Sequence, residues 1–336
     1  MPGFRFGACL IWILCPLAAH AAEADSFAVV SAGFAEIGQS RYITPDITPA
    51  IVKAQVLLDR ANISTGEIDG KRSLRLNEAI AAFAEIHNLP PDTGWSRAFW
   101  DELTREAIVS PLVTYAITSG DLKGPFVQLP PRMEDQISFK TLGYSDVREA
   151  LAEKFHMSIE LLAALNPNAS FSVAGEEIVV ANVLTEPRSP LAARIDVDKD
   201  RQTVKVYAAK DDMIAFFPAS VGSEEKPTPS GRLKVTAINN EPIYRYNPRY
   251  QFREVETRKA FNLQPGPNSP LGVMWIALSK PSYGIHGTPE PSQVGRAASH
   301  GCVRLTNWDA QRLASMLTRG VPVNFIEKPD ATFVAY

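Results

Sequence analysis

The spacing of apolar positions changes along the chain. Over residues 46–105 apolar side chains recur at helical spacing, most clearly from Leu76 to Ile86, and a turn at residues 67–70 separates two such stretches. From about residue 191 apolar and polar positions alternate instead, as in Thr203–Tyr207. Alternation of this kind is typical of half-buried strands. The pattern therefore predicts a small helical unit early in the chain and a mainly β domain at its end.

A second small unit is expected between these two, at residues 137–183. Asp146, with Glu149 three positions later, has the pattern of a helix N-cap. Asn166 and Pro167 must end a second short helix, because proline cannot continue it. Residues 173–180 then indicate a turn followed by a strand.

Proline-rich breaks help to separate the units, at residues 45–49, 90–91, 125–131 and 187–190. The last unit is expected to span residues 191–327. It contains one confidently placed helix, which begins at a capping-box pattern over Thr306–Asp309 and ends at Gly320.

Residues 1–21 have the features of a secretory signal peptide. Arg5 precedes a short apolar run, and Ala19-His20-Ala21 has the small residues of a cleavage site. The run is short for a membrane span. We therefore expect an exported protein that works in the periplasm or cell envelope.

The charge balance narrows the class of partner. The 336 residues carry a formal net charge of -3, and 45% of them are hydrophobic. Phosphate binding requires a basic face, so nucleic acid is not expected as a partner. The length and hydrophobic content allow more than one core.

The candidate chemistry centres on one cysteine. The chain has three cysteines, Cys9, Cys15 and Cys302, and removal of residues 1–21 would leave Cys302 alone. Exported proteins usually pair their cysteines, so an unpaired one is a candidate nucleophile. A thiol reacts as thiolate and needs a base nearby. His286 lies 16 positions upstream and His300 two positions upstream, and position alone does not decide between them.

Two other uses of these side chains fit the sequence less well. Catalytic zinc needs three ligands at fixed geometry, and no further cysteine is available, so no metal and no cofactor are expected. A redox thiol would normally have a resolving cysteine, which the mature chain lacks. The isolated His87 and His156 are assigned no catalytic role, because such histidines are usually surface or capping residues.

Four ordered blocks of the last unit resemble the YkuD-type catalytic domain of the L,D-transpeptidases. The blocks are ASVG with PTPSG (219–231), PNSPLG (267–272), IHGT (285–288) and SHGCVRL (299–305). The resemblance implies a β-sandwich-like domain in which Cys302 is the nucleophile and His286 the base, with the Gly287 carbonyl orienting the imidazole.

Further residues of the SHGCVRL block complete the expected site. Gly301 permits a close backbone approach, so its amide and that of Cys302 could face the developing oxyanion. Ser299 and His300 are expected to shape the site. Arg304 is a candidate for binding a substrate carboxylate, although arginine is also common on surfaces.

The two front units resemble modules that hold proteins on the cell wall. Residues 46–105 resemble a small peptidoglycan-binding domain, and residues 137–183 resemble a LysM module, a strand-helix-helix-strand unit that binds N-acetylglucosamine. The LysM-like unit departs from that family at Gly143–Asp146, where a Gly-Asp-Thr run is usual. The whole chain is therefore expected to be multidomain and α+β.

The resemblance implies acyl transfer on peptidoglycan. Cys302 would form a thioester with a tetrapeptide stem and release D-alanine, and an amine would then resolve the thioester. The acceptor could be a neighbouring stem, the lysine of an outer-membrane lipoprotein or a D-amino acid. A cysteine hydrolase, either an L,D-carboxypeptidase or an amidase, would use the same dyad with water. A scaffold with an inactive domain is disfavoured because Cys302 and His286 are both present.

Overall fold

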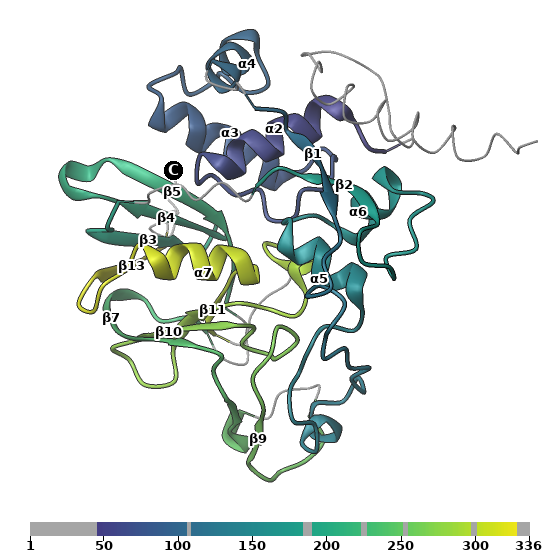
Figure 1. Cartoon of the computed structure of the whole chain (residues 1–336). Coiled ribbons are helices and arrows are strands. Elements are labelled where there is room, and N and C mark those ends of the chain that lie inside the picture. Colours follow the sequence, from purple (N-terminus) through teal and green to yellow (C-terminus); the bar gives the residue numbers. More distant parts are fainter. Residues whose placement is uncertain are drawn as a thin grey trace, which may run out of the picture.

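The structure is a computed structural model that describes residues 46–105, 109–183, 190–222, 227–250, 255–296 and 301–327. The expected signal peptide, residues 1–21, lies outside these residues. Figure 1 shows helices at the top, a helix and strand unit on the right and a large curved sheet on the left. No helix in the described part of the chain is both long and apolar enough to cross a membrane.

The first unit contains three helices, α2 (Pro49–Arg60), α3 (Leu74–Ile86) and α4 (Arg97–Thr104). Serine side chains cap the second and third: Ser73 accepts from the Leu76 N–H, and Ser96 accepts from the Phe99 N–H. Phe83 and Phe99 meet edge to face in the core, with their ring centres 5.5 Å apart. Helical spacing thus gives helices here, as predicted.

The second unit has the element order strand, helix, helix, strand. It comprises β1 (Leu112–Ala116), the 3-10 turn η1 (Met133–Gln136), α5 (Val147–Lys154), α6 (Ile159–Leu165) and β2 (Glu177–Ala181). Asp146 caps α5 as expected. The strand that pairs with β2 lies at 112–116, however, upstream of the expected boundary at residue 137. The backbone groups of β2 are hydrogen-bonded to β1, an antiparallel strand that lies far from β2 in the sequence.

The last unit is built on one nine-stranded sheet within the described residues. Its spatial order is β5-β4-β3-β13-β7-β10-β11-β12-β6. The strands are β3 (Arg194–Asp198), β4 (Thr203–Tyr207), β5 (Met213–Pro218), β6 (Ser220–Val221), β7 (Gly231–Asn240), β10 (Met274–Leu278), β11 (Gly284–His286), β12 (Val303–Arg304) and β13 (Pro322–Ile326).

The sheet curls until its two ends meet. Strands β5 and β6 stand at opposite ends of the spatial order, yet only Ala219 separates them along the chain. Helix α7 (Asn307–Ser315) packs its buried face into the resulting core, together with residues of β3, β4, β10 and β11. The domain is mainly β, as predicted, and the expected sandwich is one continuous curved sheet.

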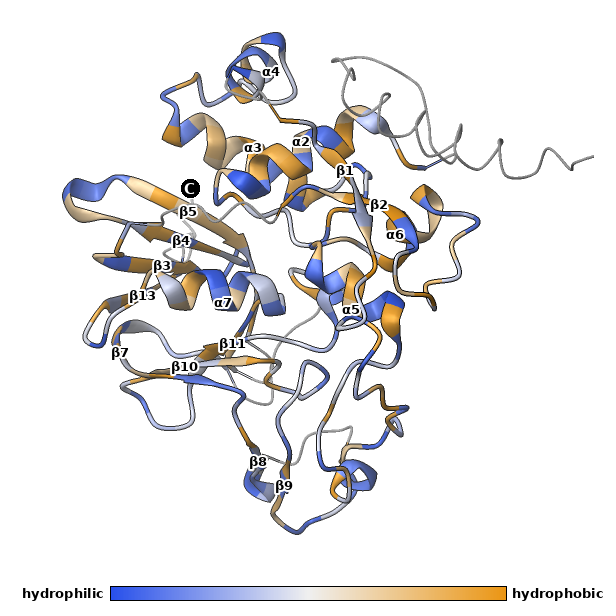
Figure 2. Ribbon diagram, viewed as in Figure 1, coloured by the Kyte–Doolittle hydropathy of each residue, from blue (hydrophilic) through white to orange (hydrophobic). Residues whose placement is uncertain are grey.

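A small hairpin and short 3-10 turns extend this sheet. Strands β8 (Tyr244–Tyr246) and β9 (Phe261–Leu263) pair antiparallel below it in Figure 2. The turns are η2 (Ala209–Asp211), η3 (Pro248–Tyr250) and η4 (Pro291–Gln293).

The units share their cores rather than standing apart. Met213 and Phe216 of β5 belong to the core of the first unit, and Figure 2 shows α2 and α3 largely hydrophobic beside that strand. Residues of α2 in turn belong to the core of the second unit. Separation into three independent units, which the proline-rich breaks suggested, is therefore incomplete, because apolar faces of each unit are covered by the next.

A buried ionic cluster also joins all three units. Asp59 of α2 accepts from Arg312 of α7 at 2.7 Å, and its other oxygen lies 3.0 Å from His156 Nδ1 of the second unit. These charged partners hold the pKa of the Asp59 carboxyl well below its usual range, despite complete burial.

Two other buried carboxyls near these junctions predict a pH-dependent stability. Burial raises the pKa of Glu153 to about 8, with Glu149 and Glu67 nearby, and that of Asp309 to about 6, against the attraction of Arg312. The folded state therefore holds protons that the unfolded state releases, and stability falls as pH rises from about 4 to about 8. We expect the free energy of unfolding, measured by urea denaturation, to fall by several kcal/mol over this range, on the order of 5 kcal/mol.

The Glu153→Gln and Asp309→Asn variants check this assignment. In Glu153→Gln the free energy of unfolding should depend less on pH above about pH 5. In Asp309→Asn it should depend less on pH below about pH 6. A wild-type stability that rises steadily over pH 4 to 8 would contradict the prediction.

Candidate active site

The two expected catalytic side chains come from neighbouring parallel strands. β11 pairs with β12 so that Ile285 lies opposite Val303 and His286 opposite Arg304. Cys302 directly precedes β12, and residues two apart on a strand point to the same side. The register thus directs Cys302, Arg304 and His286 toward one face of the sheet.

That face borders a cavity of about 980 Å³, which Cys302, His286 and Arg304 all line. One wall is residues 239–247, at the end of β7 and in β8, and another is contributed by Pro131, Met133 and Gln136 near η1. The described residues therefore bring the predicted nucleophile and base to one pocket, and part of the pocket wall comes from the segment between β1 and α5.

His286 is held in one orientation by its neighbour. Its side chain is 5% exposed, and Nδ1 lies 2.6 Å from the Gly287 carbonyl oxygen. A carbonyl only accepts hydrogen bonds, so Nδ1 carries the proton and Nε2 is left able to accept one. The Trp275 ring stacks on the imidazole, with ring centres 5.6 Å apart. This arrangement matches the geometry expected for Gly287.

Cys302 is a buried thiol at the cavity. It is 9% exposed, and it forms no disulfide with any other residue that the structure describes. Its Sγ lies 3.8 Å from the carbonyl oxygen of Ser282, in the turn between β10 and β11. A thiol must lose its proton before it attacks, so the reaction at this position requires a base.

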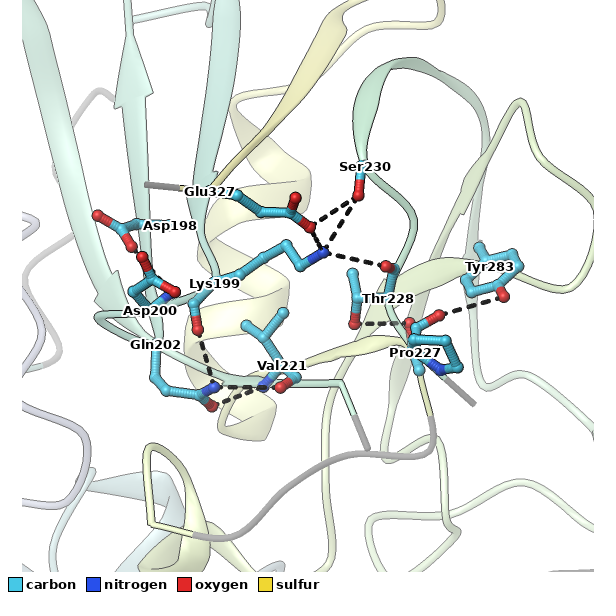
Figure 3. Close-up of polar contacts among 11 residues, drawn as sticks. Asp198, Lys199, Asp200, Gln202, Val221, Pro227, Thr228, Ser230, Tyr283 and Glu327 are labelled. Atoms are coloured by element: carbon cyan, nitrogen blue, oxygen red, sulfur yellow. Dashed lines mark hydrogen bonds and ion pairs between the residues drawn. The ribbon is translucent and has the colours of Figure 1, made fainter. Parts of the chain in front are cut away.

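The turn before Cys302 is held by a polar network, drawn in Figure 3. Gly301 has a φ of +87°, which suits glycine. Thr228 donates to the Gly301 carbonyl at 3.1 Å, and Lys199 donates to the Thr228 carbonyl at 3.2 Å. Lys199 also pairs with Glu327, and Tyr283 donates to the Pro227 carbonyl. Since C=O and N–H point in opposite directions across a trans peptide, this network sets the direction of the Cys302 N–H.

Replacing Thr228 with valine should therefore weaken the site without unfolding the domain. The variant keeps the size of the side chain and loses the hydroxyl that holds Gly301. We expect acylation of Cys302 to slow about tenfold or more, because catalytic groups must be held close to the productive geometry. Thr228→Ser should retain most of the rate. Wild-type acylation by Thr228→Val would show that the hydroxyl is dispensable.

Of the remaining predicted site residues, the structure describes Arg304 but neither Ser299 nor His300. Arg304 is half-buried and lines the cavity. Ser299 and His300 lie outside the described residues, so their roles stay predictions. No set of three or more metal-binding side chains occurs among the residues that the structure describes.

One residue of the site was missed by sequence reasoning. Asn307 begins α7, and its Oδ1 accepts from the N–H groups of Val273 and Thr288, both at 3.2 Å. A Cβ at Gly272 would lie 1.9 Å from this oxygen, and one at Gly287 2.2 Å. Glycines in the PNSPLG and HG blocks thus leave room for Asn307, a relation that only the fold reveals.

Comparison with known proteins places this site in a family. The sequence model described as the L,D-transpeptidase catalytic domain, YkuD, matches residues 192–325. A protein of Bacillus licheniformis named as an L,D-transpeptidase, YkuD, is 30% identical over 178 residues, which cover 52% of this chain and 91% of that protein. The chain belongs to the L,D-transpeptidase family. It is accordingly an enzyme of that class.

Two further L,D-transpeptidases match this chain at lower identity. The Bacillus subtilis protein of the same name is 27% identical over 179 residues, covering 53% of this chain and 92% of that one. The solved structure of an L,D-transpeptidase from Mycobacterium smegmatis is 19% identical, covers 45% of this chain and 66% of that chain, and has a TM-score of 0.34.

Proposed function

We propose that this L,D-transpeptidase acts through a thioester on Cys302. The observation that carries the proposal is the joint placement of Cys302 and His286 at one cavity, with Nδ1 of His286 bound to Gly287 O. Nε2 would take the thiol proton while Sγ attacks the carbonyl between diaminopimelate and the terminal D-alanine. Collapse of the tetrahedral intermediate would break the C–N bond, and His286 would return the proton to the leaving amine of D-alanine.

The same proposal assigns the other residues of the block. The amides of Gly301 and Cys302 would stabilise the oxyanion, because backbone donors fixed in advance need no reorganisation during the reaction. Ser299 and His300 would shape this part of the site. Arg304 would bind a carboxylate of the stem, for which arginine is well suited.

The second half-reaction would consume an amine. The cavity is lined by carboxylates of Glu241 and Glu290 as well as by Arg245 and Arg304, so it offers contacts for both charges of a stem peptide. A neighbouring stem would give a cross-link, and the lysine of an outer-membrane lipoprotein would give protein attachment. Attack by water instead would make the enzyme an L,D-carboxypeptidase or an amidase.

Product analysis separates these reactions. The full chain without residues 1–21 is incubated with disaccharide tetrapeptide, and products are identified by mass. We expect free D-alanine and cross-linked dimers. Tripeptides without dimers would favour the hydrolase, and an unchanged tetrapeptide would contradict the proposal.

We further propose that the protein is exported to the periplasm or cell envelope and that its front units bind peptidoglycan. The resemblance of these units to wall-binding modules supports this, and binding would raise the local concentration of enzyme at its polymeric substrate. The inactive full chain Cys302→Ala should sediment with insoluble sacculi, with little effect of moderate salt, because its charge does not favour an anionic wall. Protein that stays in the supernatant would contradict wall binding.

A further inference from the structure

One buried carboxyl of the second unit reaches into the catalytic domain. Glu153 lies on α5 and is 7% exposed. Its two oxygens accept from Asn307 Nδ2 at 3.2 and 3.0 Å, and one of them also accepts from the Tyr144 hydroxyl at 3.2 Å. A carboxyl is rarely buried to this extent unless its oxygens accept hydrogen bonds. The bonds from Asn307 and Tyr144 therefore offset the cost of burying Glu153.

The partner of Glu153 holds the segment that follows the proposed base. With Nδ2 occupied by Glu153 and by the Pro267 carbonyl, the amide of Asn307 has one orientation available. Its Oδ1 then accepts from Thr288 N and Val273 N. Flipping the amide would place its NH₂ group against these two N–H groups and its oxygen against Glu153, so the Glu153 carboxyl helps to hold the amide in this orientation.

The next contact is with the catalytic histidine itself. Thr288 follows Gly287, where a Cβ would lie 2.2 Å from Asn307 Oδ1 and whose carbonyl accepts from His286 Nδ1 at 2.6 Å. A continuous series of contacts thus runs from Glu153 through Asn307 and residues 287–288 to the imidazole. It starts in the unit that sequence reasoning assigned only to wall binding.

We propose that Glu153 is a positioning residue for catalysis: by orienting Asn307 it fixes the Gly287 carbonyl, which keeps His286 in the tautomer and direction needed to accept the thiol proton. The proposal rests on the proposed function of His286 as base. It makes the second unit a part of the active site's support, in addition to any role in binding the wall.

The protonation state of Glu153 determines which replacement can rescue it. Burial raises the pKa of this carboxyl to about 8, and the groups that face it are Glu149, Glu67 and the Tyr144 hydroxyl. Near neutral pH the group is therefore mostly an uncharged acid. Glutamine has the same shape and retains a carbonyl oxygen for Asn307, whereas leucine has a similar volume and no acceptor.

The test compares three variants of the full chain without residues 1–21: Glu153→Leu, Glu153→Gln and the matched control Asp309→Asn. Asp309 is also a fully buried carboxyl at a junction between units, but its oxygen accepts from Ser64 at 2.7 Å and does not contact residues 286–288. The rate of Cys302 acylation by a carbapenem is followed by intact mass from pH 5 to 9. Melting temperatures are recorded alongside.

We expect Glu153→Leu to acylate about 10²-fold more slowly than wild type, as displaced catalytic groups do. The pH at which the base deprotonates should also fall, because the Gly287 carbonyl would no longer stabilise the imidazolium. Glu153→Gln should recover most of the rate and the wild-type pH profile. Asp309→Asn should keep both, even where its melting temperature falls as far as that of Glu153→Leu.

Two results would contradict the role of Glu153 and leave the proposed function standing. One is an unchanged acylation rate and pH profile in Glu153→Leu. The other is an equal loss of rate in Glu153→Leu and Asp309→Asn with no shift of the profile in either, which would show structural support only. Absence of any adduct on the wild type would contradict the proposed function and the inference together, so the two failures are distinguishable.

Discussion

Replacement of Cys302 by alanine is expected to abolish release of D-alanine from tetrapeptide stems and to leave the fold intact. The thiol is the nucleophile in the proposed reaction, and the structure offers no second thiol among its described residues. Loss of a small buried sulfur should cost little stability, since the side chain lies at the edge of a cavity rather than within the core. D-alanine release and the melting temperature are the two measurements.

Cys302→Ser is the matched control for this variant. Serine keeps the shape and a donor for the Ser282 carbonyl, but its hydroxyl is far harder to deprotonate than a thiol. It should therefore also be inactive or nearly so, with a wild-type melting temperature. Turnover retained by Cys302→Ala would exclude Cys302 as the nucleophile.

Replacement of His286 by alanine is expected to slow acylation by about 10²- to 10⁴-fold, the usual contribution of a general base. The structure supports this histidine because Nδ1 donates to the Gly287 carbonyl, which makes Nε2 the unprotonated, basic nitrogen of the ring. The rate of carbapenem adduct formation measures acylation without a requirement for an acceptor amine.

His300→Ala is the comparison that separates the two histidines. We expect a smaller effect, exerted through the local shape of the site, because His286 has the orienting carbonyl expected of the base. If His300→Ala lost more activity than His286→Ala with both proteins folded, the base would have been assigned wrongly.

Local signals in the sequence predicted much of the secondary structure. Asp146 caps α5 and Thr306 caps α7 as expected, because the N-cap hydrogen bond joins residues three apart. Alternation likewise predicted the strands, since it reports burial on one face of a sheet. The placement of His286 beside Cys302 was expected from the resemblance of the HG and SHGC blocks to the family, because position alone did not choose between His286 and His300.

Features that depend on distant contacts were not predictable in this way. β1 has the strand-forming sequence LVTYA, but only its pairing with β2 places it in the second unit. Asn307 was recognised at the start of a helix, but its contact with residues 273 and 288 depends on how α7 packs on the sheet. Glu153 had no motif at all, because its partner lies 154 positions away.

Buried contacts join the front units to the catalytic domain, so the front units are not weakly tethered modules. Weakly tethered modules could be removed without disturbing catalysis, whereas here Ser64 bonds Asp309 and Asp59 bonds Arg312 across the boundary. Truncation would expose apolar faces of β5 and leave buried charges unpaired, which is strongly destabilising. Point variants of the full chain are therefore the appropriate means of testing the front units.

The central claim, a covalent thioester on Cys302, is tested most directly by the mass of the intact protein. The full chain without residues 1–21 is mixed with tetrapeptide at low concentration and quenched in acid, and the labelled peptide is then located by fragmentation. We expect an adduct with the mass of the stem minus D-alanine, on the peptide that contains Cys302, and its loss when an acceptor amine is added. An adduct on another residue, or turnover of the tetrapeptide by the Cys302→Ala variant, would contradict it.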